Sequence, residues 1–486
     1  MCHEDMISVC LAVPDTLRAP AAYTFETLAL RWGLPLSFTE CAEEATIIYE
    51  VESSGQRTQG LRLRCDPLLY AAETRCSHAC HFGFEVWGNA NTVAAEVGDA
   101  VGGAYRLLTY LDESRVRRDR RDRDSSVLTS ALPDCRRAIA AEPIVENHAE
   151  LLLQQVLATR PDLSQAIIPR WPHGKRWALA VTHSTDHVHI GSRGELISSL
   201  LNSARHLDPT SLKLFRLGVR YRHKPCQNPY FMFPRWRKWE SQRKIKSAFY
   251  LYLRPDGVPR DTNDCRSSMA DPGMEWGRLK DMADSGWEFG LHPSINSRND
   301  PESLAAATAC LESNLGLAVH GVRHHSLALD WRRPHVTHLI HARCGLGYDS
   351  SIAWMDAAGF RAGTCLPYRA FDPDDKRTVP LLVMPLSLKD RHIIQWRSTV
   401  QEREYEAAVQ AGLSIVETVK THGGCAVLDW HQESAFNELS YARHLDVLRA
   451  ILKPVLEDSS VWIATPWEIC QHWEALANRI VPTSVL

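Results

Sequence analysis

Long apolar segments are absent from this sequence. No apolar run approaches the roughly 18 uninterrupted residues that a membrane-spanning helix needs. The beginning also lacks a basic start followed by an apolar stretch, because Glu4 and Asp5 make it acidic and Pro14, Asp15 and Arg18 interrupt it soon afterwards. We therefore expect a cytoplasmic protein with no membrane insertion.

A dominant charge of one sign is missing as well. The net charge of the 486 residues is −3, and 23% of them are charged, so nothing draws the whole surface to nucleic acid. The arginine-rich run at 115–124 contains interleaved aspartates that cancel much of its field, which favours a solvated segment over a phosphate-binding one. We expect a small-molecule substrate and no nucleic-acid partner, and the oligomeric state stays open.

A paired-cysteine framework is also lacking. The 14 cysteines are scattered along the chain, which is typical of reduced thiols rather than of a disulfide-stabilised secreted domain. The tightest cluster, at 76–81, has no second ligand pair nearby, whereas structural zinc normally needs four ligands. The cysteines therefore indicate neither a disulfide scaffold nor a zinc knuckle.

The length and the segment pattern predict two domains, because 486 residues exceed what one core usually holds. Residues 1–112 alternate apolar and helical segments, which indicates a small α/β domain. Residues 113–145 are expected to form a charged linker. From 146 to 486 strand-like and helix-like segments alternate, which is typical of βα units around a parallel sheet or barrel. The expected strands begin near Trp177, Lys246, Glu288, Val319, Leu346, Gly359, Leu381, Cys425 and Val461.

Two helices of the second domain carry clear boundary signals. Asp300 is a good N-cap, Pro301 suits the first turn, and Gly316 is a good terminator. A second helix is expected from about Arg403 to His422, before two glycines.

Several of the expected strands end in polar chemistry. The apolar run that begins at Trp177 continues into Thr182-His183-Ser184-Thr185-Asp186-His187. Three further segments run from apolar residues to histidine, aspartate or arginine: 288–296, 321–325 and 426–431. Because the carboxyl ends of parallel strands meet at one rim, we expect these side chains to gather there.

This pattern predicts an open metal site with one carboxylate, two imidazoles and a position for water. Asp186, His292 and one of His324 or His325 are the candidate ligands, since nitrogen and oxygen donors suit zinc and related divalent metals. The alternative is that these are separate histidines on loop ends, because the chain has 22 histidines.

Six motifs, in this order, resemble those of polysaccharide deacetylase-like proteins, specifically the large cytosolic subgroup with a separate N-terminal domain. The resemblance covers roughly residues 140–475. The motifs are Thr182-His183-Ser184-Thr185-Asp186-His187, Gly290-Leu291-His292-Pro293-Ser294, Gly321-Val322-Arg323-His324-His325, Gly347-Tyr348-Asp349-Ser350-Ser351, Gly359-Phe360-Arg361-Ala362-Gly363-Thr364 and Leu428-Asp429-Trp430-His431.

The resemblance implies an irregular (β/α) barrel of the polysaccharide deacetylase type that follows a smaller α/β domain. It implies one divalent metal ion, usually zinc, held by Asp186, His292 and His325, and hydrolysis of an amide on an amino sugar or glycoconjugate. His431 matches the family acid and Arg323 the arginine that positions the base, while a regular strand would let Asp429 orient His431. The expected substrate contacts are Arg361, Tyr368, Ser294 and Asn296.

Two departures from the family pattern change what is expected. Ser184 stands where the subgroup usually has the aspartate that serves as general base, and a serine hydroxyl does not hold a proton-accepting charge near neutral pH. Asn296 stands where typical members have a second histidine, which His325 could replace. Either His183 or His187 then serves as base, or metal-bound hydroxide forms without one, or the protein is a carbohydrate-binding pseudoenzyme.

Overall fold

The structure is a computed structural model of the chain. It describes residues 5–481 apart from 52–58, 72–75, 82–83, 90–97, 118–126, 189–195, 198–199, 202–208, 222–223, 225–226, 254–273, 395–401 and 439–440. Most of the arginine-rich run at 115–124 therefore lies outside the described residues. Within the part of the chain that the structure describes, no helix is both long enough and apolar enough to cross a membrane.

The N-terminal part contains a four-stranded parallel sheet in the order β2-β1-β3-β4. The strands are β1 (Ile7–Ala12), β2 (Leu36–Thr39), β3 (Ile47–Glu50) and β4 (Leu61–Arg64), and a separate antiparallel hairpin pairs β5 (Cys76–His81) with β6 (Phe84–Asn89). The helices of this part are α1 (Asp15–Trp32), α2 (Ala100–Leu108), α3 (Leu111–Ser114), α4 (Asp134–Ala138) and α5 (Ile144–Thr159). Helix α5 packs against α1, α2 and β6, so it belongs with this layer in space.

The second sheet has ten strands in the order β12-β13-β11-β10-β9-β8-β7-β15-β14, and β16 also pairs with β7. The strands are β7 (Trp177–Thr185), β8 (Ala248–Leu253), β9 (Glu288–Pro293), β10 (Gly321–Val322), β11 (Tyr348–Asp349), β12 (Tyr368–Asp372), β13 (Arg377–Val383), β14 (Leu388–Lys389), β15 (Cys425–Asp429) and β16 (Val461–Ile463). Every ladder is parallel except that between β12 and β13.

The order of these strands follows a ring, because consecutive strands from β7 to β11 are neighbours and β15 returns to β7. Among the described residues no ladder joins β13 to β14. The segment 384–387 crosses that gap: the Met384 amide donates to Asp349 O at 2.8 Å, and the Ser387 amide donates to Val427 O at 3.1 Å. The fold is thus α/β with an interrupted parallel barrel, as the sequence predicted.

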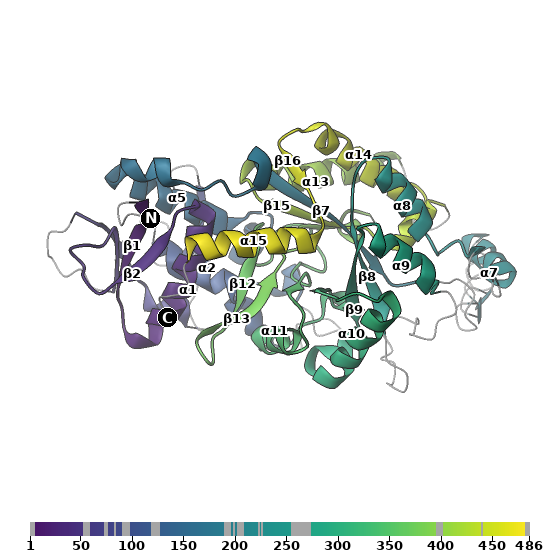
Figure 1. Cartoon of the computed structure of the whole chain (residues 1–486), viewed down its shortest axis with the longest axis horizontal. Coiled ribbons are helices and arrows are strands. Elements are labelled where there is room, and N and C mark those ends of the chain that lie inside the picture. Colours follow the sequence, from purple (N-terminus) through teal and green to yellow (C-terminus); the bar gives the residue numbers. More distant parts are fainter. Residues whose placement is uncertain are drawn as a thin grey trace.

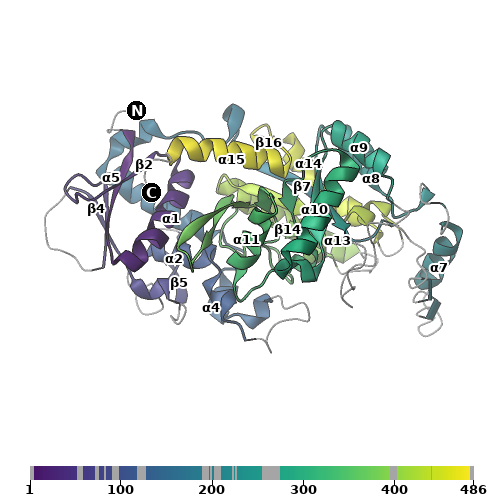
Figure 2. The same cartoon turned by 60° about the horizontal axis from the view of Figure 1, so that its bottom comes forward.

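The outer layer of the barrel is helical. The helices of this part of the chain are α7 (Pro209–Tyr221), α8 (Phe233–Ser241), α9 (Trp276–Asp284), α10 (Pro301–Leu315), α11 (Pro334–Arg343), α12 (Asp390–Ile393), α13 (Glu402–Thr421), α14 (His444–Glu457) and α15 (Pro466–Ile480), of which α7 stands apart from the barrel in Figures 1 and 2. Figures 1 and 2 show α8 to α11 outside the strands, with α15 extending toward the N-terminal sheet. Helix α15 packs against α1, which ties the end of the barrel sequence to the N-terminal part.

The boundary signals of α10 are confirmed. The Asp300 side chain accepts a hydrogen bond from the Ser303 amide at 3.0 Å, and Gly316 ends the helix at a φ of 69°. The strand expected near Gly359 was wrong: Gly359 and Gly363 have φ values of 133° and 64°, which break an extended segment. The domain boundaries at 112 and 145 stay a prediction.

Strand β7 explains how the barrel separates its two faces. All nine of its residues are buried, as expected for a parallel strand covered on both sides. Leu179 and Val181 pack with the helices of the outer layer, whereas Ala178 and Ala180 belong to a second apolar cluster. Because side chains alternate along a strand, His183 continues the outer face and Ser184 continues the other.

Candidate active site

The candidate site lies where the parallel strands end. Asp186 follows β7, His292 is near the end of β9, Arg323 follows β10 and His431 follows β15. Asp186, His292 and His431 are each no more than 3% exposed. Parallel register brings these strand ends to a common rim, so residues up to 245 positions apart become neighbours.

Asp186 is the centre of the cluster. Its Oδ1 lies 3.3 Å from His292 Nε2, and its Oδ2 lies 3.5 Å from His431 Nε2. The Arg391 guanidinium donates to Asp186 Oδ2 at 2.7 Å. Burial alone would raise the pKa of Asp186, but the positive charge of Arg391 and the His431 imidazole outweigh it and hold the pKa well below its ordinary value. Asp186 is therefore a carboxylate at neutral pH.

His292 is oriented so that its outer nitrogen faces that carboxylate. Its Nδ1 bonds to the Arg323 carbonyl oxygen, which only accepts hydrogen bonds, so Nδ1 carries the proton. Burial lowers the pKa of His292, which favours the neutral ring with a lone pair on Nε2. Two acceptor atoms, His292 Nε2 and Asp186 Oδ1, then face each other, an arrangement that a cation stabilises.

His431 is oriented in the same way by a different residue from the one expected. Its Nδ1 bonds to Asp390 Oδ1 at 2.7 Å, and its backbone amide donates to Asp390 Oδ2 at 3.0 Å. Asp429 does not orient this ring, because the chain turns after β15 and Asp429 points to other partners. His431 Nε2 is thus directed at Asp186 by a buried carboxylate, which is how a histidine is prepared for proton transfer.

Asp429 instead balances Arg323 inside the barrel. Arg323 Nη1 donates to Asp429 Oδ1 at 2.8 Å, and both residues are fully buried. Ser184 donates twice to the same carboxylate, from its amide to Oδ1 and from its hydroxyl to Oδ2, both at 2.9 Å. Burial would raise the pKa of Asp429, but the Arg323 charge outweighs it and keeps the pKa below its ordinary value. A carboxylate of the neighbouring strand β15 therefore lies against Ser184.

The two histidines proposed as substitute bases are placed differently. His183 Nε2 lies 2.9 Å from Glu240 Oε1 and its Nδ1 lies 2.8 Å from Trp430 O, so both nitrogens are engaged. Its ring packs on Trp236, and it is fully buried on the outer face of β7. His183 thus lies away from Asp186 on the other face of β7, and its proposed role as base stays a prediction. His187 is partly buried just after Asp186, and its proposed role stays a prediction.

The two adjacent histidines after β10 point in different directions. His324 Nε2 lies 2.9 Å from His341 Nε2, and His341 Nδ1 lies 3.1 Å from Asp349, so His324 belongs to a separate buried cluster. The His325 ring is 5.5 Å from the His292 ring, centroid to centroid, and nearly perpendicular to it. His325 is therefore the residue on the side of the candidate site, and its role as a ligand stays a prediction.

The expected substrate contacts are not brought to the rim together. Arg361 is fully buried, with its guanidinium 3.3 Å above the Trp331 ring and its Nη1 bonded to Ala353 O at 3.0 Å. Tyr368 is buried on the edge strand β12, where its hydroxyl bonds to that of Tyr110. Both side chains have partners in the interior, and substrate contact by either of them stays a prediction.

Two further residues of that set lie near His292 in sequence. The Ser294 hydroxyl is buried and lies 3.0 Å from the Ser297 hydroxyl, which engages it within its own turn. Asn296 is exposed in the short 3-10 helix η8 (Ile295–Asn299) that follows β9. Substrate contact by either residue stays a prediction.

Sequence reasoning missed three charged residues of this region. Asp390 and Arg391 begin α12 directly after the short strand β14, and Glu433 lies in the 3-10 helix η10 (Gln432–Phe436) after His431. The cluster Lys389-Asp390-Arg391-His392 follows an apolar segment, which is the same signal that identified the other strand ends. β14 has only two residues, too few to recognise from periodicity.

The donor set fits a divalent metal ion. Asp186 offers oxygen, His292 offers nitrogen, and Nδ1 of His292 is held by a backbone carbonyl, as is usual for metal-binding histidines.

The three expected ligands are not tightly clustered, however. Within the described residues, the one group of three whose ligand atoms all lie within 4.8 Å is His335, Asp372 and Asp374. That group could hold a metal at the β12–β13 turn, where Arg333 already pairs with Asp374 at 2.5 Å.

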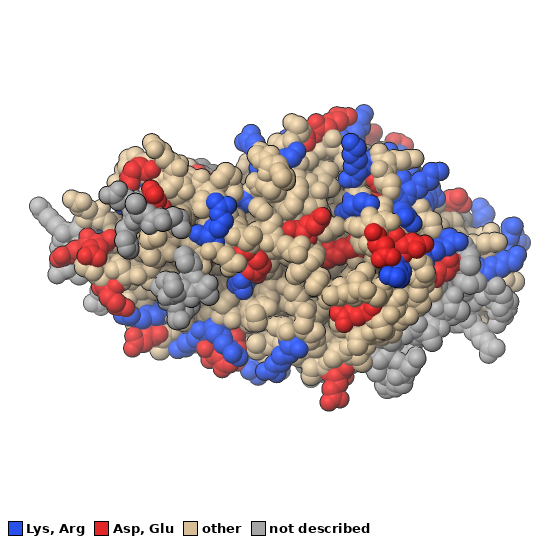
Figure 3. All heavy atoms as spheres, viewed as in Figure 1, with Lys and Arg blue, Asp and Glu red and all other residues tan. Residues whose placement is uncertain are grey.

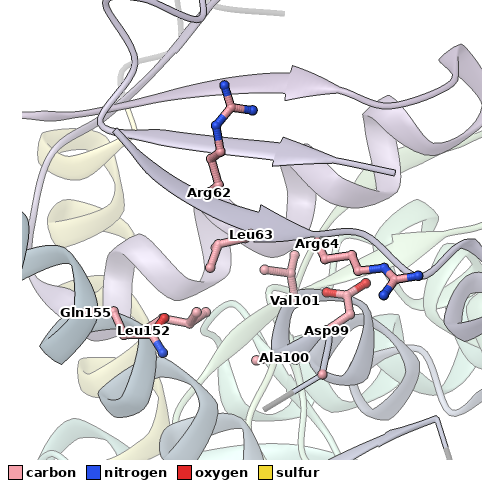
Figure 4. Close-up of a pocket in the computed structure, with 9 residues that line it drawn as sticks. Arg62, Leu63, Arg64, Asp99, Ala100, Val101, Leu152 and Gln155 are labelled. Atoms are coloured by element: carbon pink, nitrogen blue, oxygen red, sulfur yellow. The ribbon is translucent and has the colours of Figure 1, made fainter. Parts of the chain in front are cut away.

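A pocket of about 190 Å³ lies elsewhere, in the N-terminal part between β4, the start of α2 and α5 (Figure 4). Arg64 and Asp99 lie side by side at its edge, and none of the expected site residues lines it. Basic and acidic side chains are interspersed over the face of the molecule seen in Figure 3.

Solved structures resemble this chain, although no family model and no curated protein matches its sequence. A protein from Mycobacterium smegmatis named as a polysaccharide deacetylase is 18% identical over 65% of this chain and 96% of its own, with a TM-score of 0.41. An allantoinase is 14% identical over 63% of this chain and 93% of its own, with a TM-score of 0.41. A protein from Pseudomonas aeruginosa PAO1 named as a polysaccharide deacetylase is 15% identical over 63% of this chain and 94% of its own, with a TM-score of 0.39.

The α/β fold rests on the strand order and register of the chain itself.

Proposed function

We propose that this chain is a metal-dependent hydrolase that cleaves a C–N amide bond, with de-N-acylation of an amino sugar or a related polar metabolite as its reaction. The observation that carries the proposal is the convergence of His292 Nε2 and His431 Nε2 on the two oxygens of Asp186, at 3.3 and 3.5 Å. Each ring is held by a hydrogen bond from its other nitrogen. A carboxylate between two oriented imidazoles supplies both ligands and a proton donor.

Asp186 and His292 would hold the metal, with His325 as the further ligand, and zinc is the metal proposed. A bound divalent ion lowers the pKa of water toward neutrality and polarises the amide carbonyl. His431 gives a proton from Nε2 to the departing amine, while Asp390 keeps Nδ1 protonated and fixes the ring.

The proton from the attacking water has an acceptor in spite of Ser184. The Ser184 hydroxyl donates to Asp429 Oδ2 at 2.9 Å. When Ser184 Oγ accepts a proton from water, it can therefore pass its own hydroxyl proton to Asp429. Arg323 holds that carboxylate in place at 2.8 Å. In this proposal Arg323 has the base-positioning role that the family resemblance implies, and Asp429 is the carboxylate that it positions.

The experiment is a hydrolysis assay with purified full-length protein, zinc and a panel of N-acetylated amino sugars and short oligosaccharides, with released acetate as the readout. We expect turnover that chelation abolishes. His431→Asn should lower the rate by about 100-fold or more, because it removes the proton donor. Turnover that is unchanged by chelator, or unchanged in His431→Asn, contradicts the proposal.

One observation favours a second candidate, a carbohydrate-binding protein without hydrolysis. Arg391 already places a fixed positive charge 2.7 Å from Asp186 Oδ2, where it neutralises the carboxylate without a metal. This candidate predicts binding of amino-sugar ligands in calorimetry, no acetate release and no dependence of binding on zinc. Zinc-dependent acetate release would exclude it.

A further inference from the structure

Helix α7 carries an exposed face of positive charge. Lys213, Arg216 and Arg220 are three and four positions apart, so they share one face of the helix, and all three are exposed. The helix contains no acidic residue. Among the residues that the structure describes, none of the three forms an ion pair with an acidic side chain. The positive charge of this face is therefore not compensated within the molecule.

This excess of positive charge is local. Residues 205–224 contain six lysines and arginines and one acidic residue, whereas the net charge of the whole chain is −3. Figure 3 shows Lys and Arg side chains at the end of the molecule where Figure 1 places α7. A concentrated, uncompensated charge of this kind attracts a partner of opposite charge.

Apolar side chains are exposed beside this charge. Val219 is 53% exposed and lies on the same face of α7, three positions after Arg216. Six large apolar residues are exposed in the part of the chain that the structure describes, and four of them belong to the connection between β7 and β8: Ile197, Leu200, Leu201 and Val219. A polysaccharide or a nucleic acid offers no aliphatic surface to cover them, whereas the boundary between lipid headgroups and acyl chains does.

The other side of α7 holds the helix at the rim of the barrel. Leu214 and Leu217 are partly buried and pack against a small apolar cluster that consists of Tyr230, Phe436 and Tyr441. Phe436 belongs to η10, which follows the end of β15, and the connection that contains α7 starts from the end of β7. The exposed face of α7 therefore belongs to the same side of the barrel as the strand ends that form the candidate site.

We propose that this face of α7, formed by Lys213, Arg216, Val219 and Arg220, docks the protein on the surface of a membrane that contains anionic lipids. The helix lies in the plane of the headgroups, with its cations against the lipid phosphates and Val219 at the boundary with the acyl chains. Docking through a few exposed cations is reversible and is weakened by salt. It does not need the metal of the proposed function, so each can fail without the other.

The test measures sedimentation of the full-length protein with vesicles of phosphatidylcholine, either alone or mixed with phosphatidylglycerol. The α7 variant combines Lys213→Gln, Arg216→Gln and Arg220→Gln, and the single variants Arg216→Gln and Val219→Ser are measured beside it. Dextran sulfate, a soluble polyanion without acyl chains, serves as competitor.

A matched control neutralises three cations on other helices: Arg343→Gln, Lys453→Gln and Arg479→Gln. These residues are exposed on α11, α14 and α15, and among the described residues they too form no ion pair. The control and the α7 variant have the same net charge, so a difference between them reports the position of the charge.

We expect wild type to bind the vesicles that contain phosphatidylglycerol, to bind them less as salt rises, and not to bind phosphatidylcholine alone. Each cation near an anionic membrane strengthens binding about five-fold, so the α7 variant should bind about 100-fold more weakly and Arg216→Gln about five-fold more weakly. The control should bind like wild type, and Val219→Ser should weaken binding. The single variants keep the test decisive if the α7 variant does not fold.

Three results would overturn the proposal. One is the absence of wild-type binding to the anionic vesicles. Another is an equal loss in the α7 variant and the control, which would make net charge alone responsible. The third is full displacement by dextran sulfate together with unchanged binding in Val219→Ser, which would assign the face to a soluble polyanion.

Discussion

Exchanging the side chains at positions 184 and 429 tests how the buried charge of Arg323 is balanced. Asp429 on β15 and Ser184 on β7 are hydrogen-bonded neighbours at 2.9 Å, and Arg323 donates to the carboxylate at 2.8 Å. The perturbations are Asp429→Ser, Ser184→Asp and the two together, which moves the carboxylate from one strand to its neighbour.

The single variants should both be destabilised. Asp429→Ser leaves the fully buried guanidinium of Arg323 without its carboxylate, and removing one partner of a buried ion pair costs about 3–5 kcal/mol. Ser184→Asp places a second carboxyl group against Asp429, and we expect a loss of about 2 kcal/mol because the pair can take up a shared proton. In the double variant one carboxylate again faces Arg323, so the loss should be about 2 kcal/mol in total.

The assay is denaturant unfolding at equilibrium, followed by circular dichroism and by tryptophan fluorescence. The three free energies give a coupling energy, which we expect to be about 3 kcal/mol or more in favour of the double variant. Losses that simply add would refute the reasoning, because they would mean that a carboxylate at position 184 cannot replace Asp429 as the partner of Arg323.

Two further predictions concern the stability of the protein. Burial lowers the pKa of His148 to about 4, below the ordinary value of 6.5, so the folded state binds fewer protons and loses stability as the pH falls from about 6.5 to 4. His148→Gln retains an acceptor for the Trp87 amide, and should reduce the stability lost between pH 7 and pH 5 by about 2 kcal/mol in urea titrations; an unchanged pH dependence would contradict this. A Cβ at Gly321 would lie 2.2 Å from the buried Tyr348 hydroxyl, so Gly321→Ala should lower the free energy of unfolding by about 1–3 kcal/mol. A melting temperature equal to that of wild type would contradict this.

The sequence predicts those parts of the fold that depend on local signals. Helix α10 begins and ends where Asp300 and Gly316 indicate, because an N-cap side chain and a left-handed glycine act within a few residues. Asp186 and His292 could be predicted as neighbours because the end of a parallel strand is readable from its own apolar run.

The parts that could not be predicted depend on pairings between distant segments. Asp390 orients His431 because β14 pairs with β15 at Leu388 and Leu428, and two-residue strands leave no periodic pattern in the sequence. The partners of His183, Glu240 and Trp430 O, likewise come from distant segments, although the alternation along β7 places His183 on the same face as Val181.

The role of position 184 depends on such a pairing as well. The sequence shows only that Ser184 lacks a carboxyl group, whereas the register of β15 against β7 brings Asp429 next to it. The contact between Ser184 and Asp429 therefore depends on the strand register, which the sequence of one motif does not contain.

The measurement that tests the central claim most directly is the metal content of the full-length protein. Protein purified without chelator or metal-affinity resin is analysed by elemental mass spectrometry, beside Asp186→Ala prepared in the same way. The account predicts about one zinc or similar divalent ion per chain in wild type and its loss in the variant. Wild-type protein that holds no metal after reconstitution, or Asp186→Ala protein that holds as much as wild type, would contradict it.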